Sequence, residues 1–214
     1  MEKVSRQLYG WLAFFAFFGL TLSLILTAFN VDPLDIKDQT LFHQDTAPNR
    51  IVGFFSYFTI WSNIVVGILG ICIWRDKTNF KTFKNLFATG LIMITVTGLV
   101  YNTVLLPVFP PKGWYWITST IMHLVVPVMY NYLWITMGPR GVISTKNTLA
   151  ILQIPIIYLA YTTLHGLAIQ QWPYKFLDLT SEGFLVWLVG VAIIFGFGIV
   201  LIGLYSKLDR KQKI

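Results

Sequence analysis

Several polar side chains interrupt otherwise apolar stretches of this 214-residue sequence, and their types suit acyl-transfer chemistry. Thr59, Ser62 and Asn63 are spaced i, i+3 and i+4, so a helix would place them on one face. Ser119 and His123 are spaced i, i+4 and share a face in the same way. A hydroxyl becomes a useful nucleophile when a neighbouring base takes its proton, and histidine is the natural base near neutral pH. Thr59 and His123 therefore form a candidate catalytic pair.

Such a pair needs help from its neighbours. The apolar stretches contain no Asp or Glu to orient the imidazole, so Ser119 or Asn102 is expected to steer it. The side-chain amide of Asn63 or Asn102 could donate to a developing oxyanion. The fitting substrate is a lipid ester dissolved in the outer leaflet. Each of these residues also has a structural interpretation, because membrane-helix hydroxyls often bond their own backbone, and Asn and His often join helices.

Counting residues from the ends of the apolar stretches gives approximate depths in a membrane. At about 1.5 Å per residue, Thr59 lies about 12 Å and His123 about 13.5 Å below the outer face, Asn102 about 9 Å and His165 about 7.5 Å. This shared band predicts an outward-opening polar cavity. Its candidate lining residues are Ser62, Asn63, Asn102, Ser119 and His165.

Six stretches that lack Asp, Glu, Lys and Arg must position these residues. They cover residues 8–29, 51–74, 86–108, 114–137, 148–170 and 183–205. Runs of about 18 or more apolar residues mark transmembrane helices. The predicted fold class is therefore an all-α polytopic membrane protein, with six transmembrane helices forming one bundle and a single domain over residues 1–214.

Two prolines predict free carbonyl groups inside this bundle. Pro127 has no N–H to bond the carbonyl of His123, four residues earlier, so that carbonyl is free for another donor and the helix can kink. Pro155 should free the carbonyl of Ile151 in the same way.

Composition agrees with a membrane protein. Hydrophobic residues make up 56% and charged residues 12%, against about 25% charged in soluble domains. The 17 Phe, 10 Tyr and 8 Trp exclude a disordered chain. A single cysteine, Cys72, excludes a disulfide scaffold, and one Cys with three His excludes a zinc finger or ribbon.

The net charge of +7 is distributed unevenly. If the N-terminus is placed inside, the inner segments hold 12 of the 16 basic residues. This distribution predicts a multi-pass protein of the cell membrane whose N- and C-termini are both cytoplasmic. The basic excess then indicates topology and contact with anionic lipids, and no nucleic-acid partner is expected. The longest outer loop, Asn30–Arg50, is a solvated connector or a lid over an outward pocket.

Three short elements carry a resemblance to a known family. Residues 57–63 (YFTIWSN) resemble the Y/F-F-T-x-x-S-N signature of a bacterial family of six-span integral membrane proteins. Residues 123–127 (HLVVP) and 173–178 (PYKFLD) are similar to its H-x-V-x-P and P-Y-x-F-L-D elements. The resemblance runs in order over the second to fifth stretches and implies the six-span fold.

That bacterial family resembles, more distantly, the eukaryotic androgen-induced membrane proteins. These hydrolyse fatty acid esters of hydroxy fatty acids with an intramembrane threonine and a histidine, and the resemblance places these roles on Thr59 and His123. This chain differs in the spacing of the proline after the histidine and at Ser62 and Asn63. It also has Asn131 where bacterial relatives often carry an acidic residue.

Other function classes remain open from the sequence. One is a non-enzymatic channel, transporter or lipid-binding protein, although the absence of intramembrane carboxylates counts against coupled transport. Another is a b-type haem protein ligated by His123 and His165, whose depths differ by about 6 Å, roughly one helical turn. A purely structural or assembly role is the last. No cofactor or metal is expected, membrane lipids are the expected partners, and the oligomeric state is not indicated.

Overall fold

The computed structural model describes residues 3–31 and 46–211 as a bundle of helices. The α-helices are α1 (Lys3–Ala28), α2 (Ala47–Phe54), α3 (Phe58–Trp74), α4 (Phe83–Val100), α5 (Tyr115–Thr120), α6 (Val126–Met137), α7 (Thr148–Ile169) and α8 (Gly183–Lys211). Two π-helical turns, η1 (Tyr101–Leu105) and η2 (Ile121–Val125), continue α4 and join α5 to α6. Two 3₁₀ turns, η3 (Thr145–Asn147) and η4 (Lys175–Leu177), precede α7 and follow it.

Within the described residues, five helical stretches are long and apolar enough to cross a membrane. They are Lys3–Ala28, Phe83–Leu105, Tyr115–Met137, Thr145–Ile169 and Gly183–Arg210. The pair α2 and α3 passes the same test only when counted together, which would make six. The prediction of an all-α protein with several membrane-spanning helices is therefore confirmed at this level.

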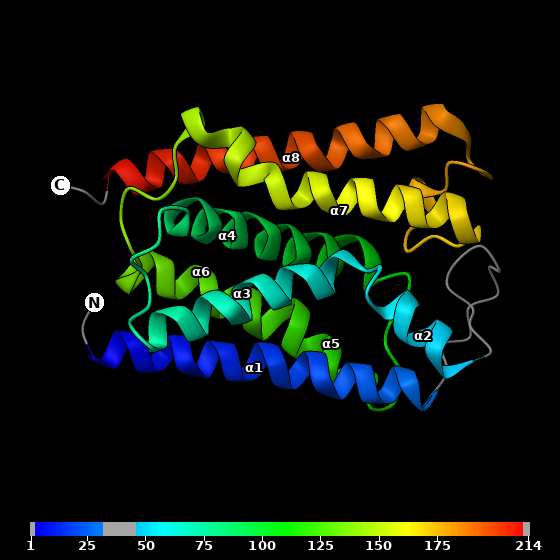
Figure 1. Cartoon of the computed structure of the whole chain (residues 1–214), viewed down its shortest axis with the longest axis horizontal. Coiled ribbons are helices and arrows are strands. Elements are labelled where there is room, and N and C mark those ends of the chain that lie inside the picture. Colours follow the sequence, from blue (N-terminus) through cyan, green and yellow to red (C-terminus); the bar gives the residue numbers. More distant parts are fainter. Residues whose placement is uncertain (1–2, 32–45, 212–214) are drawn as a thin grey trace.

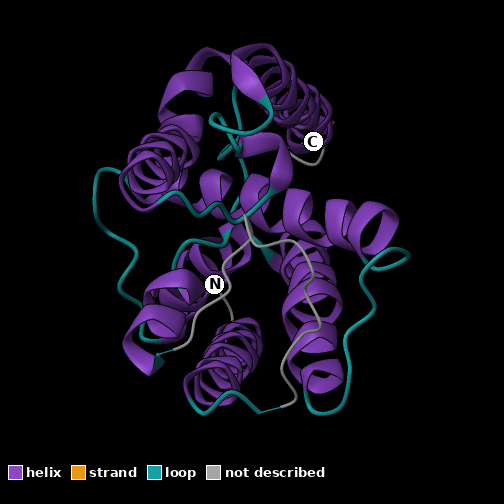
Figure 2. Ribbon diagram, turned by 90° about the vertical axis from the view of Figure 1, so that its right-hand side faces the viewer, coloured by secondary structure: helices purple, strands orange, loops and turns teal. Residues whose placement is uncertain are grey.

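The long helices run along the length of the bundle, α2 is inclined to them, and α4 lies near the centre (Figures 1 and 2). It contacts α3, α6, α7 and α8, whereas α1 packs on the opposite side of α3 and against α5 and α6. Burial agrees with this arrangement: 61% of the most apolar part of Phe83–Leu105, which is α4 with η1, is buried, against only 17% for α8. The apolar surface of α8 is what a lipid-facing helix requires.

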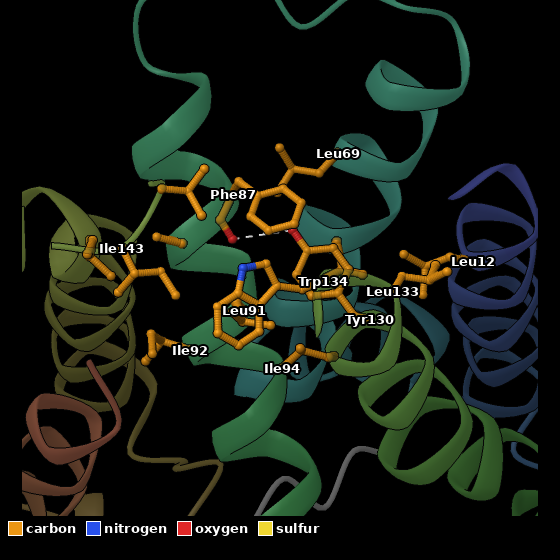
Figure 3. Close-up of a cluster of buried hydrophobic side chains, with 14 of the residues drawn as sticks. Leu12, Leu69, Phe87, Leu91, Ile92, Ile94, Tyr130, Leu133, Trp134 and Ile143 are labelled. Carbon is orange, nitrogen blue, oxygen red and sulfur yellow. Dashed lines mark hydrogen bonds between the residues drawn. The ribbon is translucent and has the colours of Figure 1, made fainter. Parts of the chain in front are cut away.

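The main core lies between α1, α3, α4 and α6, toward the end of the bundle where α1 begins and α8 ends (Figures 1 and 3). Phe87, Leu91, Tyr130 and Trp134 fill its centre and are almost completely buried. The Tyr130 hydroxyl donates to the carbonyl of Phe87 at 3.3 Å, so its polar atom is satisfied inside this apolar cluster. A smaller cluster consists of Leu20, Phe54, Ile60 and Met122, and two of its members, Ile60 and Met122, are sequence neighbours of Thr59 and His123.

The predicted continuous helix over 51–74 is wrong in one respect, because the chain breaks at residues 55–57. The axes of α2 and α3 meet at 68°. The break is stable because side chains satisfy its carbonyl groups: the Trp61 indole N–H donates to Phe55 O at 2.8 Å and the Tyr158 hydroxyl to Ser56 O at 2.8 Å. The depth of about 12 Å for Thr59 assumed a straight helix, and with this bend Thr59 instead lies in the first turn of α3.

Polar contacts fix both ends of the bundle. The Arg50 guanidinium donates to the last carbonyls of α1, Thr27 O at 2.9 Å and Ala28 O at 2.7 Å, and so anchors α2. At the other end, Arg6 pairs with Asp76 at 2.8 Å. The predicted Asn30–Arg50 loop lies mostly outside the described residues, which omit 32–45.

Candidate active site

Thr59 and His123 meet in the structure. The Thr59 hydroxyl oxygen lies 3.1 Å from Nε2 of His123, within hydrogen-bond distance. Thr59 belongs to the first turn of α3, and His123 lies in the middle of the π turn η2. Both side chains are half-buried, so the pair is neither sealed in the core nor fully exposed.

The other ring nitrogen of His123 fixes its tautomer. Nδ1 lies 3.0 Å from the carbonyl oxygen of Ser119 and 3.2 Å from the Ser119 hydroxyl. A carbonyl oxygen can only accept, so Nδ1 carries the proton and Nε2 has a free lone pair. The Thr59 hydroxyl therefore donates to Nε2, which is the arrangement that a nucleophile and its base require.

Tyr101 covers the imidazole of His123. The two rings stack with centroids 3.6 Å apart and planes inclined by 11°, and the Ser119 hydroxyl donates to the Tyr101 hydroxyl. An aromatic face attracts a cation placed over it, so this ring favours the protonated imidazole. Ser119 and Tyr101 together occupy the place that a carboxylate holds in a catalytic triad.

The carbonyl that Pro127 frees has found a donor. The Asn102 amide donates to His123 O at 2.8 Å and to Gly98 O at 2.7 Å. This contact joins the two π turns, since Asn102 lies in η1 and His123 in η2. Single π turns inside α-helices occur frequently at functional sites, where they re-aim a side chain.

Pro155 acts in the same way elsewhere in the bundle. The carbonyl of Ile151, four residues before it, accepts the Thr89 hydroxyl of α4 at 2.8 Å. Both carbonyls freed by prolines thus accept a hydrogen bond from a polar side chain of α4 or of its continuation η1. One of these bonds lies at the site and the other lies away from it.

Ser62 and Asn63 hold the backbone of Thr59. The Asn63 amide donates to Thr59 O at 2.9 Å and to Met122 O at 3.3 Å, and the Ser62 hydroxyl donates to Thr59 O at 2.9 Å. The two amide hydrogens of Asn63 are both used in these bonds, as are those of Asn102 in its own. Asn63 and Asn102 therefore position Thr59 and His123, and neither amide has a hydrogen left for the oxyanion role expected from the sequence.

A close approach of backbones brings the two π turns together. A Cβ atom on Gly98 would lie 2.8 Å from Cβ of Pro127 and 3.2 Å from the carbonyl oxygen of His123. Only glycine leaves room there, so Gly98 sets how near α4 comes to η2.

His165 belongs to a different cluster. Its Nδ1 lies 3.4 Å from the hydroxyl of Ser56, in the break between α2 and α3, and its ring stacks on Tyr161 with centroids 5.5 Å apart. The structure therefore brings together Thr59, Ser62, Asn63, Asn102, Ser119 and His123, whereas the contacts of His165 include Ser56 and Tyr161. His123 has both ring nitrogens engaged by Thr59 and Ser119, which does not suit an axial haem ligand.

Two surface grooves lie outside the site. One, of about 480 Å³, runs between α1 and α3. The other, of about 420 Å³, is lined by Phe55, Trp61, Ile64, Val65 and Tyr161. Neither is lined by Thr59 or His123. Across residues 3–31 and 46–211, no three His, Cys, Asp or Glu side chains lie together as metal ligands would.

Two tyrosines at the site carried no role in the sequence interpretation. Tyr101 directly precedes Asn102, and the π turn η1 is what rotates it onto His123. Tyr174 lies in the PYKFLD element, and its hydroxyl accepts the backbone N–H of Phe58 at 3.2 Å, next to Thr59. The PYKFLD element could have drawn attention to Tyr174, but the sequence alone does not show what this element does.

Comparisons with known proteins found no match among protein-family models, among curated proteins or among solved structures.

Proposed function

We propose that this protein is a multi-pass membrane hydrolase of lipid esters, with Thr59 as nucleophile and His123 as its base. The observation that carries the proposal is the 3.1 Å contact between the Thr59 hydroxyl and Nε2 of His123, the nitrogen left unprotonated by the Ser119 carbonyl. The resemblance to hydrolases of fatty acid esters of hydroxy fatty acids agrees with this chemistry. That ester class is the proposed substrate, the cell membrane the proposed location and membrane lipids the proposed partners.

The reaction begins as the Thr59 oxygen attacks the ester carbonyl carbon while Nε2 of His123 takes the hydroxyl proton. The C=O electron pair moves to oxygen and gives a tetrahedral oxyanion. When the pair returns, the C–O bond to the alcohol breaks, and Nε2–H gives its proton to the leaving oxygen. The products are a free alcohol and an acyl ester of Thr59.

Water completes the cycle. His123 takes a proton from a water molecule, whose oxygen attacks the acyl carbon, and then returns the proton to Thr59 as the fatty acid leaves. Throughout, the Ser119 carbonyl holds Nδ1–H, and the face of Tyr101 stabilises the imidazolium. The absence of a carboxylate makes the pair a dyad, supported by neutral groups.

The test compares purified variants in detergent. Thr59→Val keeps the shape of the side chain and removes the hydroxyl, so hydrolysis of a fatty acid ester of a hydroxy fatty acid and labelling by a fluorophosphonate probe should both be lost. His123→Ala should lower the rate about 10²–10⁴-fold, and the double variant should be no slower than Thr59→Val, because the two residues act as a unit. Thr59→Ser should retain part of the activity.

A matched control is Thr103→Val. Thr103 is an exposed threonine whose hydroxyl bonds only its own helix, at Leu99 O, 2.7 Å away. It should leave labelling and hydrolysis unchanged. If Thr59→Val hydrolyses the ester as fast as wild type with an unchanged thermal melt, the non-enzymatic interpretation, a channel, transporter or lipid-binding protein, takes over.

A further inference from the structure

A hydrolase needs a hydrogen-bond donor for the oxyanion, and the two asparagines of the site have none to give. Both hydrogens of each amide are donated to backbone carbonyls. Removal of such a donor typically costs about 10²–10³-fold in kcat, so the site needs another group in that place. The candidates are polar hydrogens near the Thr59 hydroxyl on the side away from His123.

Tyr174 is the polar side chain that the α7–α8 connection brings to the start of α3. Its hydroxyl oxygen accepts the N–H of Phe58 at 3.2 Å, and Thr59, the next residue, lies close enough for its backbone and side chain to interact with that oxygen. The hydroxyl therefore lies beside the nucleophile, and the Phe58 N–H occupies one of its lone pairs. Its own hydrogen is left to be donated in turn.

The connection holds this tyrosine firmly. The ring of Phe176 stacks on that of Tyr174, with centroids 5.6 Å apart, and packs so closely on α8 that a Cβ on Gly190 would lie 2.6 Å from it. The ring of Tyr57 also packs edge-to-face with that of Tyr174, with centroids 5.9 Å apart. A group fixed before the reaction stabilises developing charge without the cost of reorganisation.

Asp178 stabilises the same α7–α8 connection. Burial raises the pKa of its carboxyl, but hydrogen bonds from Ser181 and Thr180 outweigh burial and hold the pKa below its usual value. The charged carboxylate accepts Ser181 N–H at 2.8 Å and the Thr180 hydroxyl at 2.7 Å. Leu177 and Asp178 are buried, so the PYKFLD element is anchored at its end as well as at its aromatic rings.

We infer that Tyr174 is the oxyanion donor of this site: its hydroxyl donates to the carbonyl oxygen of the ester as Thr59 attacks. This inference rests on the proposed hydrolase function. Once the Thr59 oxygen bonds the acyl carbon, the former carbonyl oxygen lies one bond further on, within reach of a hydroxyl already placed against Thr59. Burial raises the pKa of Tyr174, so the hydroxyl keeps its proton at neutral pH.

The test is Tyr174→Phe, which keeps the ring and removes the hydroxyl. In the full-length protein in detergent, kcat for the fatty acid ester should fall about 10²–10³-fold with KM changed less than about twofold. Affinity for an alkyl boronic acid, which forms a tetrahedral adduct with the nucleophile, should fall by a similar factor. Affinity for a fatty alcohol, which forms no adduct, should not change, and a merely structural role would not separate these two inhibitors.

The matched control is Tyr132→Phe, the same change on an exposed tyrosine of α6, and it should keep wild-type kcat. Activities are compared below the lowest melting temperature of the set. If Thr59→Val is inactive but Tyr174→Phe has wild-type kcat and boronic acid affinity, Tyr174 is not the donor, and the hydrolase proposal stands. If Thr59→Val is fully active, both proposals fail.

Discussion

Two carbonyl oxygens freed by prolines provide a matched pair of residues for mutation. Asn102 bonds the carbonyl of His123, and Thr89 bonds that of Ile151. Each replacement by an apolar residue, Asn102→Leu or Thr89→Val, leaves one buried acceptor without a donor. We expect each to lower the free energy of unfolding by about 1–3 kcal/mol, measured by thermal unfolding in detergent.

The two variants should differ in activity. Asn102→Leu removes the bond that holds the backbone of His123, so ester hydrolysis should fall more than stability alone explains. Thr89→Val acts on α7, away from the dyad, and should hydrolyse at the wild-type rate once folded. Equal activities in the two variants would show that the Asn102 contact serves only the fold.

At the level of residues, the sequence reached the pairing of Thr59 with His123 by counting depths along helices. The two side chains meet although the depth of Thr59 was counted along a straight helix, which the break before α3 interrupts. It could not find Tyr101 or Tyr174. The position of Tyr101 depends on a π turn, and that of Tyr174 depends on a connection that folds back over α3.

The same count placed His165 in the band of the dyad, yet its ring packs on Tyr161 and lies beside Ser56. Depth along a membrane normal is one coordinate, and the angular position around the bundle is another. Helix periodicity gives the angle only relative to neighbours on the same helix. Packing between helices, which decides the rest, depends on shapes such as the glycine contact at Gly98.

At the level of elements, the apolar stretches predicted the spans, but not the break at residues 55–57. The segment is apolar enough to continue as a helix, and its composition carries no proline. Trp61 and Tyr158 supply the hydrogen bonds that make the break tolerable, and Tyr158 comes from α7, about 100 residues later. Such a tertiary contact is not visible in a local pattern.

The contact between α4 and η2 yields a prediction of its own. In Gly98→Ala, the added methyl meets Pro127 and the carbonyl of His123, so η2 must move by several tenths of an ångström. Misplacement of about 1 Å can cost about 10²-fold in rate, and we expect hydrolysis to fall about 10-fold or more. The measurement is kcat for the fatty acid ester, with the thermal melt recorded alongside.

Gly196→Ala is the control for this change. Gly196 lies in α8, and a Cβ atom there meets nothing within 4 Å. Its activity should equal that of wild type, and its stability should rise slightly, because alanine is the better helix former. Wild-type activity in Gly98→Ala would mean that the π turn absorbs the methyl without displacing His123.

For the whole molecule, the connections 75–82 and 138–147 lie at the end where α1 begins and α8 ends (Figure 1). These segments carry most of the basic residues of the described loops. By the positive-inside rule we expect this end in the cytoplasm. In a Cys72→Ser background, an impermeant maleimide applied to intact cells should label Lys112→Cys at the opposite end and should not label Lys81→Cys.

Both positions are exposed, so accessibility does not bias the comparison. Permeabilised cells should label both variants, which controls for expression and reactivity. Labelling of Lys81→Cys alone in intact cells would invert the topology and place the dyad in the inner leaflet.

The break before α3 also has an electrostatic consequence. A helix carries about half a positive charge at its N-terminus and half a negative charge at its C-terminus. Arg75 and Lys77 follow the C-terminal end of α3, whereas its N-terminal end carries Thr59 and has the uncharged side chains of Tyr57 and Tyr174 beside it. In a continuous helix the N-terminus, and the positive potential with it, would lie further from Thr59. By starting a new helix there, the chain gives an uncharged site a standing positive potential, and in the proposed hydrolysis the first full negative charge to experience it is the oxyanion.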